Sequence, residues 1–193
     1  RGQTVSPARF LPAIAQARLL EQFDRVVIEQ TFGQLAGDLA LYQATECCAI
    51  NITGPTLCDP AFPDFLAQRL EHHMLRPSLI TLEITESDSI TSLESAVRNA
   101  TRLKRLGVSL AIDDFGTGLA TFDYLRRFKP DWLKIDGSFV LGYEEDPLTR
   151  EIVLSTIRAA RVIGARVVAE FVESSAIAHR MAGIGVDYLQ GYA

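Results

Sequence analysis

The sequence predicts an α/β fold, a TIM-type (β/α)8 barrel of parallel strands, with about six of the eight strand–helix units lying in this chain. Strand-like and helix-like patterns alternate along the chain. The strand-like runs are apolar with little alternation, as in strands covered on both faces. Polar residues follow the carboxyl ends of these runs, which converge only when the sheet closes. An open doubly wound sheet is the alternative, but its outer strands would be too far apart to share one site.

The elements follow in order from the amino terminus. Ser6-Pro7 reads as a helix N-cap followed by proline at the first helical position, and helical periodicity runs to about Leu35, as one helix or two. The capping box Thr91-Ser92-Leu93-Glu94 opens a later helix, which Gly107 ends. The predicted strands are 46–52, 79–85, 108–113, 132–135, 166–171 and 186–189. The other predicted helices are 62–74, 121–127, 146–164 and 175–182.

Composition excludes several classes of protein. A chain of 193 residues that is 48% hydrophobic can bury the core of one domain. A net charge of -5 without a basic run argues against a nucleic-acid polymer as partner. Three cysteines are too few and too badly spaced for a disulfide framework or a zinc site. There is no signal peptide or membrane-length apolar run, so we expect no membrane contact and a cytoplasmic location, alone or within a membrane-tethered protein.

The most informative segment is Ile112-Asp113-Asp114-Phe115-Gly116-Thr117-Gly118, where two adjacent acids end an apolar strand. Adjacent carboxylates repel and are costly to bury without a cation. Similar polar residues near the other strand ends are Asn51, Glu83, Lys134, Glu170 and Gln190. Each alone also fits a structural role, but their convergence favours a site for Mg²⁺, Mn²⁺ or Ca²⁺, since oxygen ligands without His or Cys suit hard ions. Two such ions, roughly 3.5–4 Å apart, suit phosphoryl chemistry. Lys134 could hold or deprotonate the attacking water, because a lysine near cations can have a lowered pKa.

Seven ordered motifs resemble the EAL domain, a bacterial phosphodiesterase module that hydrolyses cyclic di-GMP to linear pGpG. They are Val5-Ser6-Pro7-Ala8-Arg9-Phe10, Ala49-Ile50-Asn51-Ile52-Thr53, Leu82-Glu83-Ile84-Thr85-Glu86, Asp113 to Gly118, Leu133-Lys134-Ile135-Asp136, Val168-Ala169-Glu170 and Gln190-Gly191-Tyr192. The resemblance spans nearly the whole chain and implies a modified TIM barrel, usually dimeric. It also implies a metal-dependent, cyclic di-GMP-specific phosphodiesterase with Mg²⁺ or Mn²⁺ as cofactor and two ions in the site.

The resemblance also implies roles for single residues. The metal ligands would be Asn51, Glu83, Asp113, Asp114 and Glu170. Lys134 and Glu170 would be catalytic through the nucleophilic water. Gln190 and Asp136 would bind substrate. Glu86 would order the loop after Asp113, although an ordinary loop-capping role is the alternative.

The chain departs from the family pattern at several points. Phe171 stands where the family has glycine after the catalytic glutamate, and Leu119 stands where it has an aromatic residue. The chain begins at Arg1, so we expect residues 1–193 to be a single EAL-type barrel domain that lacks its first strands, with the Glu-Ala-Leu signature, and its last segment. Further regulatory or signalling domains are expected in the parent chain.

Two other functions stay open at the sequence level. A degenerate EAL domain would bind cyclic di-GMP as a receptor without cleaving it. An unrelated barrel enzyme, such as an aldolase or an enolase-like lyase, would need a Schiff-base lysine or a different placement of its base. The retained acids and Lys134 favour the phosphodiesterase.

Overall fold

The computed structural model describes residues 5–85, 90, 92–117 and 122–192. The chain divides into two compact units, residues 1–80 with 89–108 and residues 81–88 with 109–193. Each unit is described by itself. No helix among the described residues has both the length and the apolar character needed to cross a bilayer.

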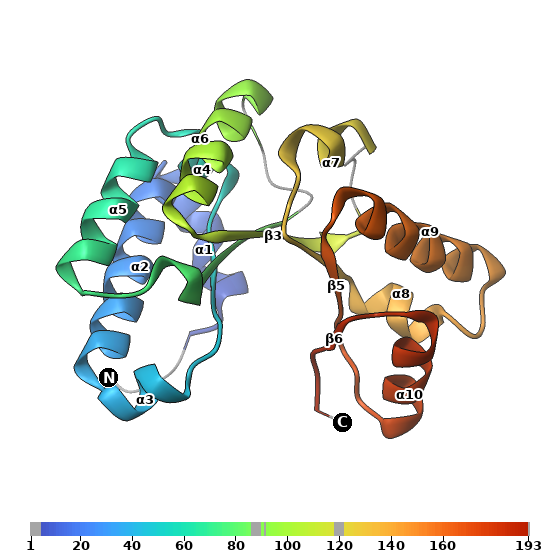
Figure 1. The fold of residues 1–193 in the computed structure, drawn as a ribbon. Helices are drawn as coiled ribbons and strands as arrows, with labels where there is room; N and C mark the ends of the chain where they lie inside the picture. The colour runs from blue at the N-terminus through green and yellow to red at the C-terminus, as the bar shows by residue number, and fades with distance from the viewer. Residues whose placement is uncertain (1–4, 86–89, 91, 118–121, 193) are drawn as a thin grey trace. The chain divides into compact units, whose positions relative to one another are not determined.

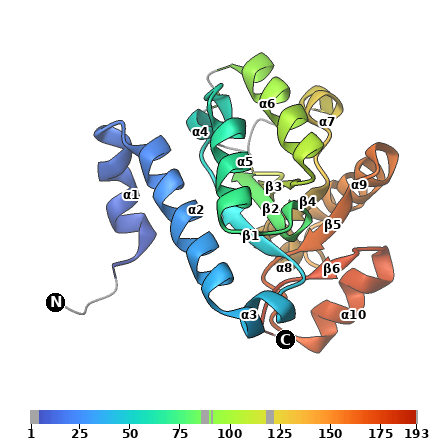
Figure 2. The same cartoon turned by 60° about the vertical axis from the view of Figure 1, so that its left-hand side comes forward.

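The first unit is mostly helical (Figure 1). Its elements are α1 (Pro7–Gln16), α2 (Leu20–Gly37), α3 (Leu39–Ala44), β1 (Cys48–Asn51), α4 (Gly54–Cys58), α5 (Phe62–His72), the 3-10 turn η1 (Pro77–Leu79) and α6 (Leu93–Leu106). The helical run predicted from Ser6 is two helices. Helix α1 lies beside the start of α2, where the rings of Phe10 and Phe23 are 5.6 Å apart (Figure 2).

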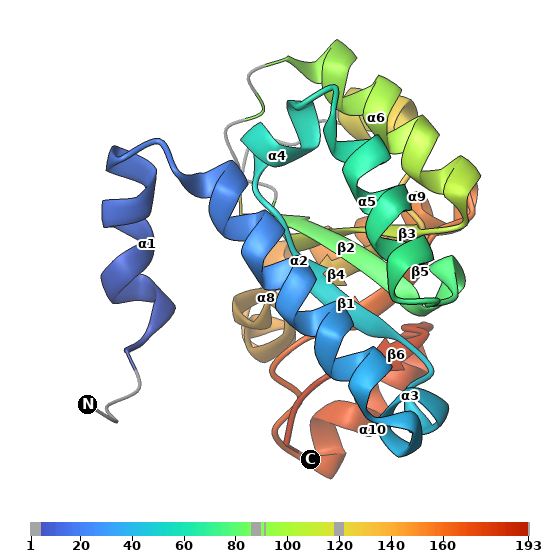
Figure 3. The same cartoon turned by 90° about the vertical axis from the view of Figure 1, so that its left-hand side faces the viewer.

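Helices α2, α4, α5 and α6 enclose the core of the first unit, and α2 runs along α5 (Figure 3). This core consists of apolar side chains at helical spacing. Full burial of one large apolar side chain stabilises the fold by about 1.5–3 kcal/mol. Fully buried members are Ile28, Phe32, Leu57, Phe62, Leu66 and Leu103. A buried amide adds a polar tie, because Asn99 Nδ2 on α6 donates to the carbonyl oxygens of Leu57 and Asp59, each at 2.8 Å.

A buried acid holds the segment that follows β1. One carboxylate oxygen of Asp24 on α2 accepts hydrogen bonds from the Thr53 amide and hydroxyl, both at 2.8 Å, and from the Thr56 hydroxyl at 2.5 Å. Thr53 is the N-cap of α4. Asp24 therefore fastens the start of α4 to α2 through donors that are all neutral. We call these three residues the Asp24 anchor.

The second unit is an α/β layer (Figure 1). Its strands are β2 (Ile80–Thr85), β3 (Ser109–Phe115), β4 (Trp132–Ile135), β5 (Arg166–Ala169) and β6 (Tyr188–Leu189). They pair in parallel and in chain order. The helices are α7 (Phe122–Phe128), α8 (Gly137–Gly142), α9 (Pro147–Ile163) and α10 (Ser175–Ile184). Helix α9 packs on β4 and β5, and α10 packs on α8 and β6.

Two aspartates tie the amino ends of the strands together. Asp131 Oδ2 accepts from the Leu110 amide at 2.9 Å, and Asp187 Oδ2 accepts from the Val167 amide at 2.7 Å. Each aspartate directly precedes β4 or β6 and bonds the neighbouring strand. These hydrogen bonds satisfy backbone amides near the amino ends of two strands. They also fix the register of neighbouring strands, which determines where the side chains at the carboxyl ends lie.

The predicted order of elements is confirmed, with differences at their ends. The short helices α3, α4 and α8 lie in segments for which the sequence predicted no helix or strand. Strand β5 ends at Ala169 rather than at Phe171, since Phe171 has a φ of 53° and cannot continue a strand. The N-cap of α6 is Ser92, whose hydroxyl accepts from the Ser95 amide, and the predicted box residue Thr91 lies outside the described residues.

Candidate active site

The two adjacent acids are placed by a β-bulge. In the pairing of β3 with β4, Ile112 faces Leu133 and Phe115 faces Ile135, so Asp113 and Asp114 together oppose the single residue Lys134. Asp114 has a φ of 53°, in the left-handed region. Successive residues of a regular strand point to opposite faces. The bulge removes that alternation and re-aims one side chain, as bulges beside functional sites do.

As a result, three carboxylates meet. Ligand oxygens of Asp113, Asp114 and Glu170 all lie within 4.8 Å of one another. Glu170 follows β5, and its amide continues the parallel ladder by donating to the Ile135 carbonyl at 3.2 Å. Strands β3 and β5, which lie on either side of β4, therefore deliver the three acids to one point at their carboxyl ends.

Lys134 of β4 lies inside this group. Its Nζ is 2.7 Å from Asp113 Oδ1, 2.7 Å from Glu170 Oε1 and 3.2 Å from Glu83 Oε2. Lys134, Glu83 and Glu170 are all buried. Three carboxylates thus share one ammonium group, and the Asp114 carboxylate lies beside two of them. We call Glu83, Asp113, Asp114, Lys134 and Glu170 the acid cluster.

Burial and mutual repulsion govern the charges in the acid cluster. Burial raises the pKa of Glu83 and Glu170, and the charge of Asp113 raises it further, against the lowering effect of Lys134. Burial also raises the pKa of Asp114, with the charges of Asp113 and Asp136 adding to it. For Lys134, burial acts to lower the pKa, but hydrogen bonds to Asp113 and Glu170 outweigh it, so its pKa is above the usual value. Lys134 therefore lies among these carboxylates as a cation.

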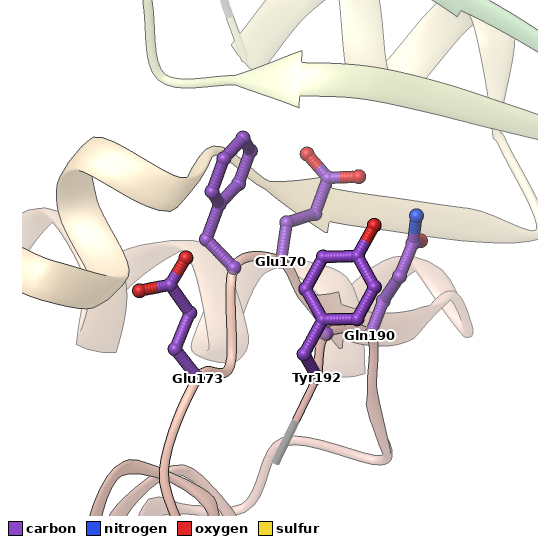
Figure 4. Close-up of a pocket in the computed structure, with 6 residues that line it drawn as sticks. Glu170, Glu173, Gln190 and Tyr192 are labelled. Carbon is purple, nitrogen blue, oxygen red and sulfur yellow. The ribbon is translucent and has the colours of Figure 1, made fainter.

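A pocket of about 390 Å³ opens beside Glu170. Its lining residues are Glu170, Phe171, Glu173, Gln190, Gly191 and Tyr192. Figure 4 shows the labelled side chains of Glu170, Glu173, Gln190 and Tyr192 extending toward the same side of the segments that carry them. The backbone of Gln190 is held on both sides, because its amide donates to the Ala169 carbonyl at 2.8 Å and its carbonyl accepts from Val172 at 3.0 Å.

The remaining predicted residues have separate positions. Asp136 is the N-cap of α8, where Oδ1 accepts from the Ser138 amide at 3.0 Å, and its charge acts on Asp114. Asn51 is the exposed last residue of β1 in the first unit. Glu86 and Leu119 lie outside the described residues.

Sequence reasoning passed over Glu173 and Tyr192, which line the pocket with Gln190. The signal was available, because both follow closely on residues already selected at strand ends. The sequence predicts that Phe171 intrudes on the barrel mouth or its neighbour, and the Phe171 side chain borders the same pocket.

The chain is similar to curated proteins and to solved structures. A protein named cyclic di-GMP phosphodiesterase PdeB, from Shewanella oneidensis, is 34% identical over 192 residues that cover 100% of this chain and 22% of that protein. The structure of the PaMucR phosphodiesterase in a c-di-GMP complex superposes with a TM-score of 0.88 at 28% identity, covering 100% of this chain and 78% of that one. A manganese and cyclic di-GMP complex of Klebsiella pneumoniae BlrP1 gives a TM-score of 0.84 at 31% identity, covering 97% and 47%.

The chain spans 22–25% of the length of the first curated relatives that it matches. The structural likeness over the whole chain shows the TIM-type (β/α)8 fold that the sequence predicts. The family model described as EAL domain matches residues 1–193, and the chain therefore belongs to the EAL domain family.

Proposed function

We propose that this chain hydrolyses cyclic di-GMP to linear pGpG as a metal-dependent phosphodiesterase. The observation that carries the proposal is the meeting of Asp113, Asp114 and Glu170 oxygens within 4.8 Å. Glu83 and Lys134 complete this acid cluster at 3.2 Å from each other. The names of the relatives, which include cyclic di-GMP phosphodiesterases, support the choice of substrate.

The chemistry of the donor set fits a hard divalent cation. Carboxylate oxygens are the ligands that Mg²⁺ and Mn²⁺ prefer, and the cluster offers no imidazole or thiolate. A single ammonium group leaves the four carboxylates with excess negative charge. Glu83, Asp113, Asp114 and Glu170 would hold one ion or two, with Asn51 as a further ligand on the strength of its motif alone. A bound divalent cation would supply Lewis-acid stabilisation of the charge that develops on the phosphate.

The chain's own residues would hold the reactants. The three N–H groups of Lys134 Nζ meet Asp113, Glu170 and Glu83, and the longest contact, 3.2 Å to Glu83, would be exchanged for one to the attacking water or a phosphate oxygen. Glu170 would accept a hydrogen bond from that water. Gln190, which lines the adjoining pocket, would hydrogen-bond the nucleotide, and Asp136 would bind substrate from the start of α8.

The second candidate is a receptor that binds cyclic di-GMP without cleaving it. Phe171 favours this candidate, because a bulky side chain stands directly after Glu170 where the family pattern has glycine. In that case the acid cluster would bind the nucleotide weakly or through Lys134, and no pGpG would form.

The family resemblance supports further proposals about the domain. Residues 1–193 would act as one EAL-type domain, in which Glu86 would order the loop after Asp113. The domain would work in the cytoplasm as a homodimer linked to signalling domains. Light scattering of the purified protein, with and without cyclic di-GMP, would test the dimer. A monomer at all concentrations would remove that proposal.

The experiment on function is a chromatographic assay of cyclic di-GMP turnover by the full-length protein with Mg²⁺, Mn²⁺ or a chelator. We expect pGpG to form only with a divalent ion. Binding of cyclic di-GMP without any pGpG would establish the receptor instead. Absence of both binding and turnover would contradict both functions.

A further inference from the structure

One side chain beside the acid cluster has no part in the chemistry described above. Phe171 directly follows Glu170 and is 57% exposed, although large apolar side chains are ordinarily buried. Its φ of 53° places a non-glycine residue in the left-handed region, which is energetically costly. Strained residues gather at functional sites, where the surrounding structure holds them in place.

The Phe171 side chain is held by its neighbours. A Cβ atom built on Gly137, the first residue of α8, would lie 2.3 Å from Phe171 Cδ2 and 2.7 Å from Phe171 Cβ. The side chain therefore packs directly on the backbone of α8, and only glycine leaves it room. On the other wall of the pocket, a Cβ on Gly191 would lie 2.2 Å from the Val172 carbonyl oxygen. Two glycine contacts thus fix the segment that carries Phe171, and the aromatic surface is preformed.

The exposed part of the Phe171 ring belongs to the pocket of about 390 Å³ that Glu170 and Gln190 line. A second aromatic residue, Tyr192, extends into the same region (Figure 4) and is 98% exposed. Two exposed aromatic rings at the border of a site for a phosphate ester suit a ligand that carries a flat base. Aromatic side chains stack on nucleic-acid bases, and the energy comes from ring overlap rather than from a hydrogen-bond pattern.

We propose that Phe171 is a substrate-binding residue whose ring stacks on one guanine base of the nucleotide while its phosphate lies at the acid cluster. This proposal rests on the proposed function, because it places a guanine nucleotide in that site. It assigns to this chain a contact that a glycine after Glu170 could not make. The aromatic contact explains why an exposed, strained phenylalanine stands at this position.

The test measures affinity in the full-length protein by calorimetry. Cyclic di-GMP is titrated with the divalent ion chelated, and pGpG is titrated with Mn²⁺ present, so that neither titration includes turnover. Phe171→Leu should weaken both affinities by about 5- to 100-fold, the range for loss of one stacked base, while Phe171→Trp should stay within about twofold of the wild type. Binding of Mn²⁺ and of inorganic phosphate, which have no base, should not change. Affinities of Phe171→Leu within twofold of the wild type would overturn the proposal.

Two further variants separate stacking from a structural role. Phe171→Gly removes both the ring and the strained φ, so we expect lost affinity with an unfolding temperature that is unchanged or higher. A lower unfolding temperature with intact affinity would show that the ring only packs, and would overturn the proposal. Gly137→Ala, which crowds the ring, should weaken affinity in the wild type and have no effect on affinity in Phe171→Gly, where no side chain is left to crowd. If the wild type binds neither nucleotide, the proposed function fails first; if it binds and the variants match it, only the stacking proposal fails.

Discussion

Buried acids occur in both units of the molecule, but the groups that compensate their charge differ. In the Asp24 anchor, one carboxylate oxygen receives three hydrogen bonds from neutral donors. In the acid cluster, four carboxylates lie together with one ammonium group that pairs with three of them, and burial raises the pKa of Glu83, Asp114 and Glu170. The carboxylate of Asp24 is compensated by hydrogen-bond donors, whereas the acid cluster has an excess of negative charge. That excess is what marks the cluster as a place for a cation.

The largest expected effect is on catalysis. Asp113→Asn keeps the size of the side chain but removes one negative charge from the acid cluster. We expect metal-dependent cleavage of cyclic di-GMP to fall by at least about 10³-fold, since several kcal/mol of charge stabilisation depend on the ion. Thermal unfolding of the metal-free variant should not occur at a lower temperature than in the wild type, because a repulsive charge is gone. Unchanged turnover would remove Asp113 from the site.

Lys134→Ala separates chemistry from stability. Removing the one ammonium group leaves buried carboxylates uncompensated, which costs about 3–5 kcal/mol of unfolding free energy when no metal is present. The kcat for cyclic di-GMP should fall by about 10²-fold or more, while affinity changes much less, as for an interaction made mainly in the transition state. Chemical denaturation and calorimetry would measure the two effects. A large loss of affinity with little change in kcat would make Lys134 a phosphate-binding residue.

Asp24→Ala tests the other side of the comparison. It leaves the Thr53 amide and two hydroxyl groups without their acceptor, and we expect a loss of about 3 kcal/mol of unfolding free energy. The loss should be the same with and without Mn²⁺, since the anchor has no role in metal binding. Asp64→Ala is the matched control, because Asp64 is an exposed partner of Arg102 and should cost less than about 1 kcal/mol. Equal losses in the two variants would mean that the anchor contributes no more than a surface pair.

The smallest expected effect comes from the cation itself. At about 100 times its dissociation constant, an ion that binds only the folded chain adds about 2.7 kcal/mol of stability. Scanning calorimetry with Mn²⁺ should show this increase in the wild type and in Asp24→Ala, and a much smaller one in Asp113→Asn. An increase of the same size in all three proteins would place the ion elsewhere.

The sequence predicted elements best where a local signal is strong. Strand β4 begins at Trp132 and ends at Ile135 as expected, and α9 begins after Asp146, whose carboxylate accepts from the Leu148 and Thr149 amides. The short helices α4 and α8 have five and six residues, too few for a periodic pattern to appear. The end of α6 at Gly107 was predictable for the same local reason, since Gly107 adopts a φ of 95°.

The acid cluster could be predicted as a set of residues but not as a geometry. Placement at strand ends selected Glu83, Lys134 and Glu170 correctly as neighbours. Strand alternation alone would have sent Asp113 and Asp114 to opposite faces, and nothing in the local sequence shows that the left-handed φ of Asp114 prevents this. The raised pKa of Lys134 depends on how many carboxylates approach its ammonium group, which is a property of the folded chain. The roles of the acid-cluster residues stay predictions, as do those of Asn51, Asp136, Gln190 and Glu86.

Because of the bulge in β3, the geometry of the acid cluster depends on the number of residues in this part of the strand as well as on their identity. Two residues of β3 span the distance that Lys134 alone spans in β4, and pairing resumes at Phe115 with Ile135. A point substitution at Asp113 or Asp114 changes a ligand but leaves this count intact. Deleting either residue would straighten the strand and turn the surviving acid with the regular pleat, so that Phe115 and everything after it would move one place along the sheet. A substitution can therefore change the chemistry of this segment, whereas a change in its length would disrupt the strand pairing on both sides of it.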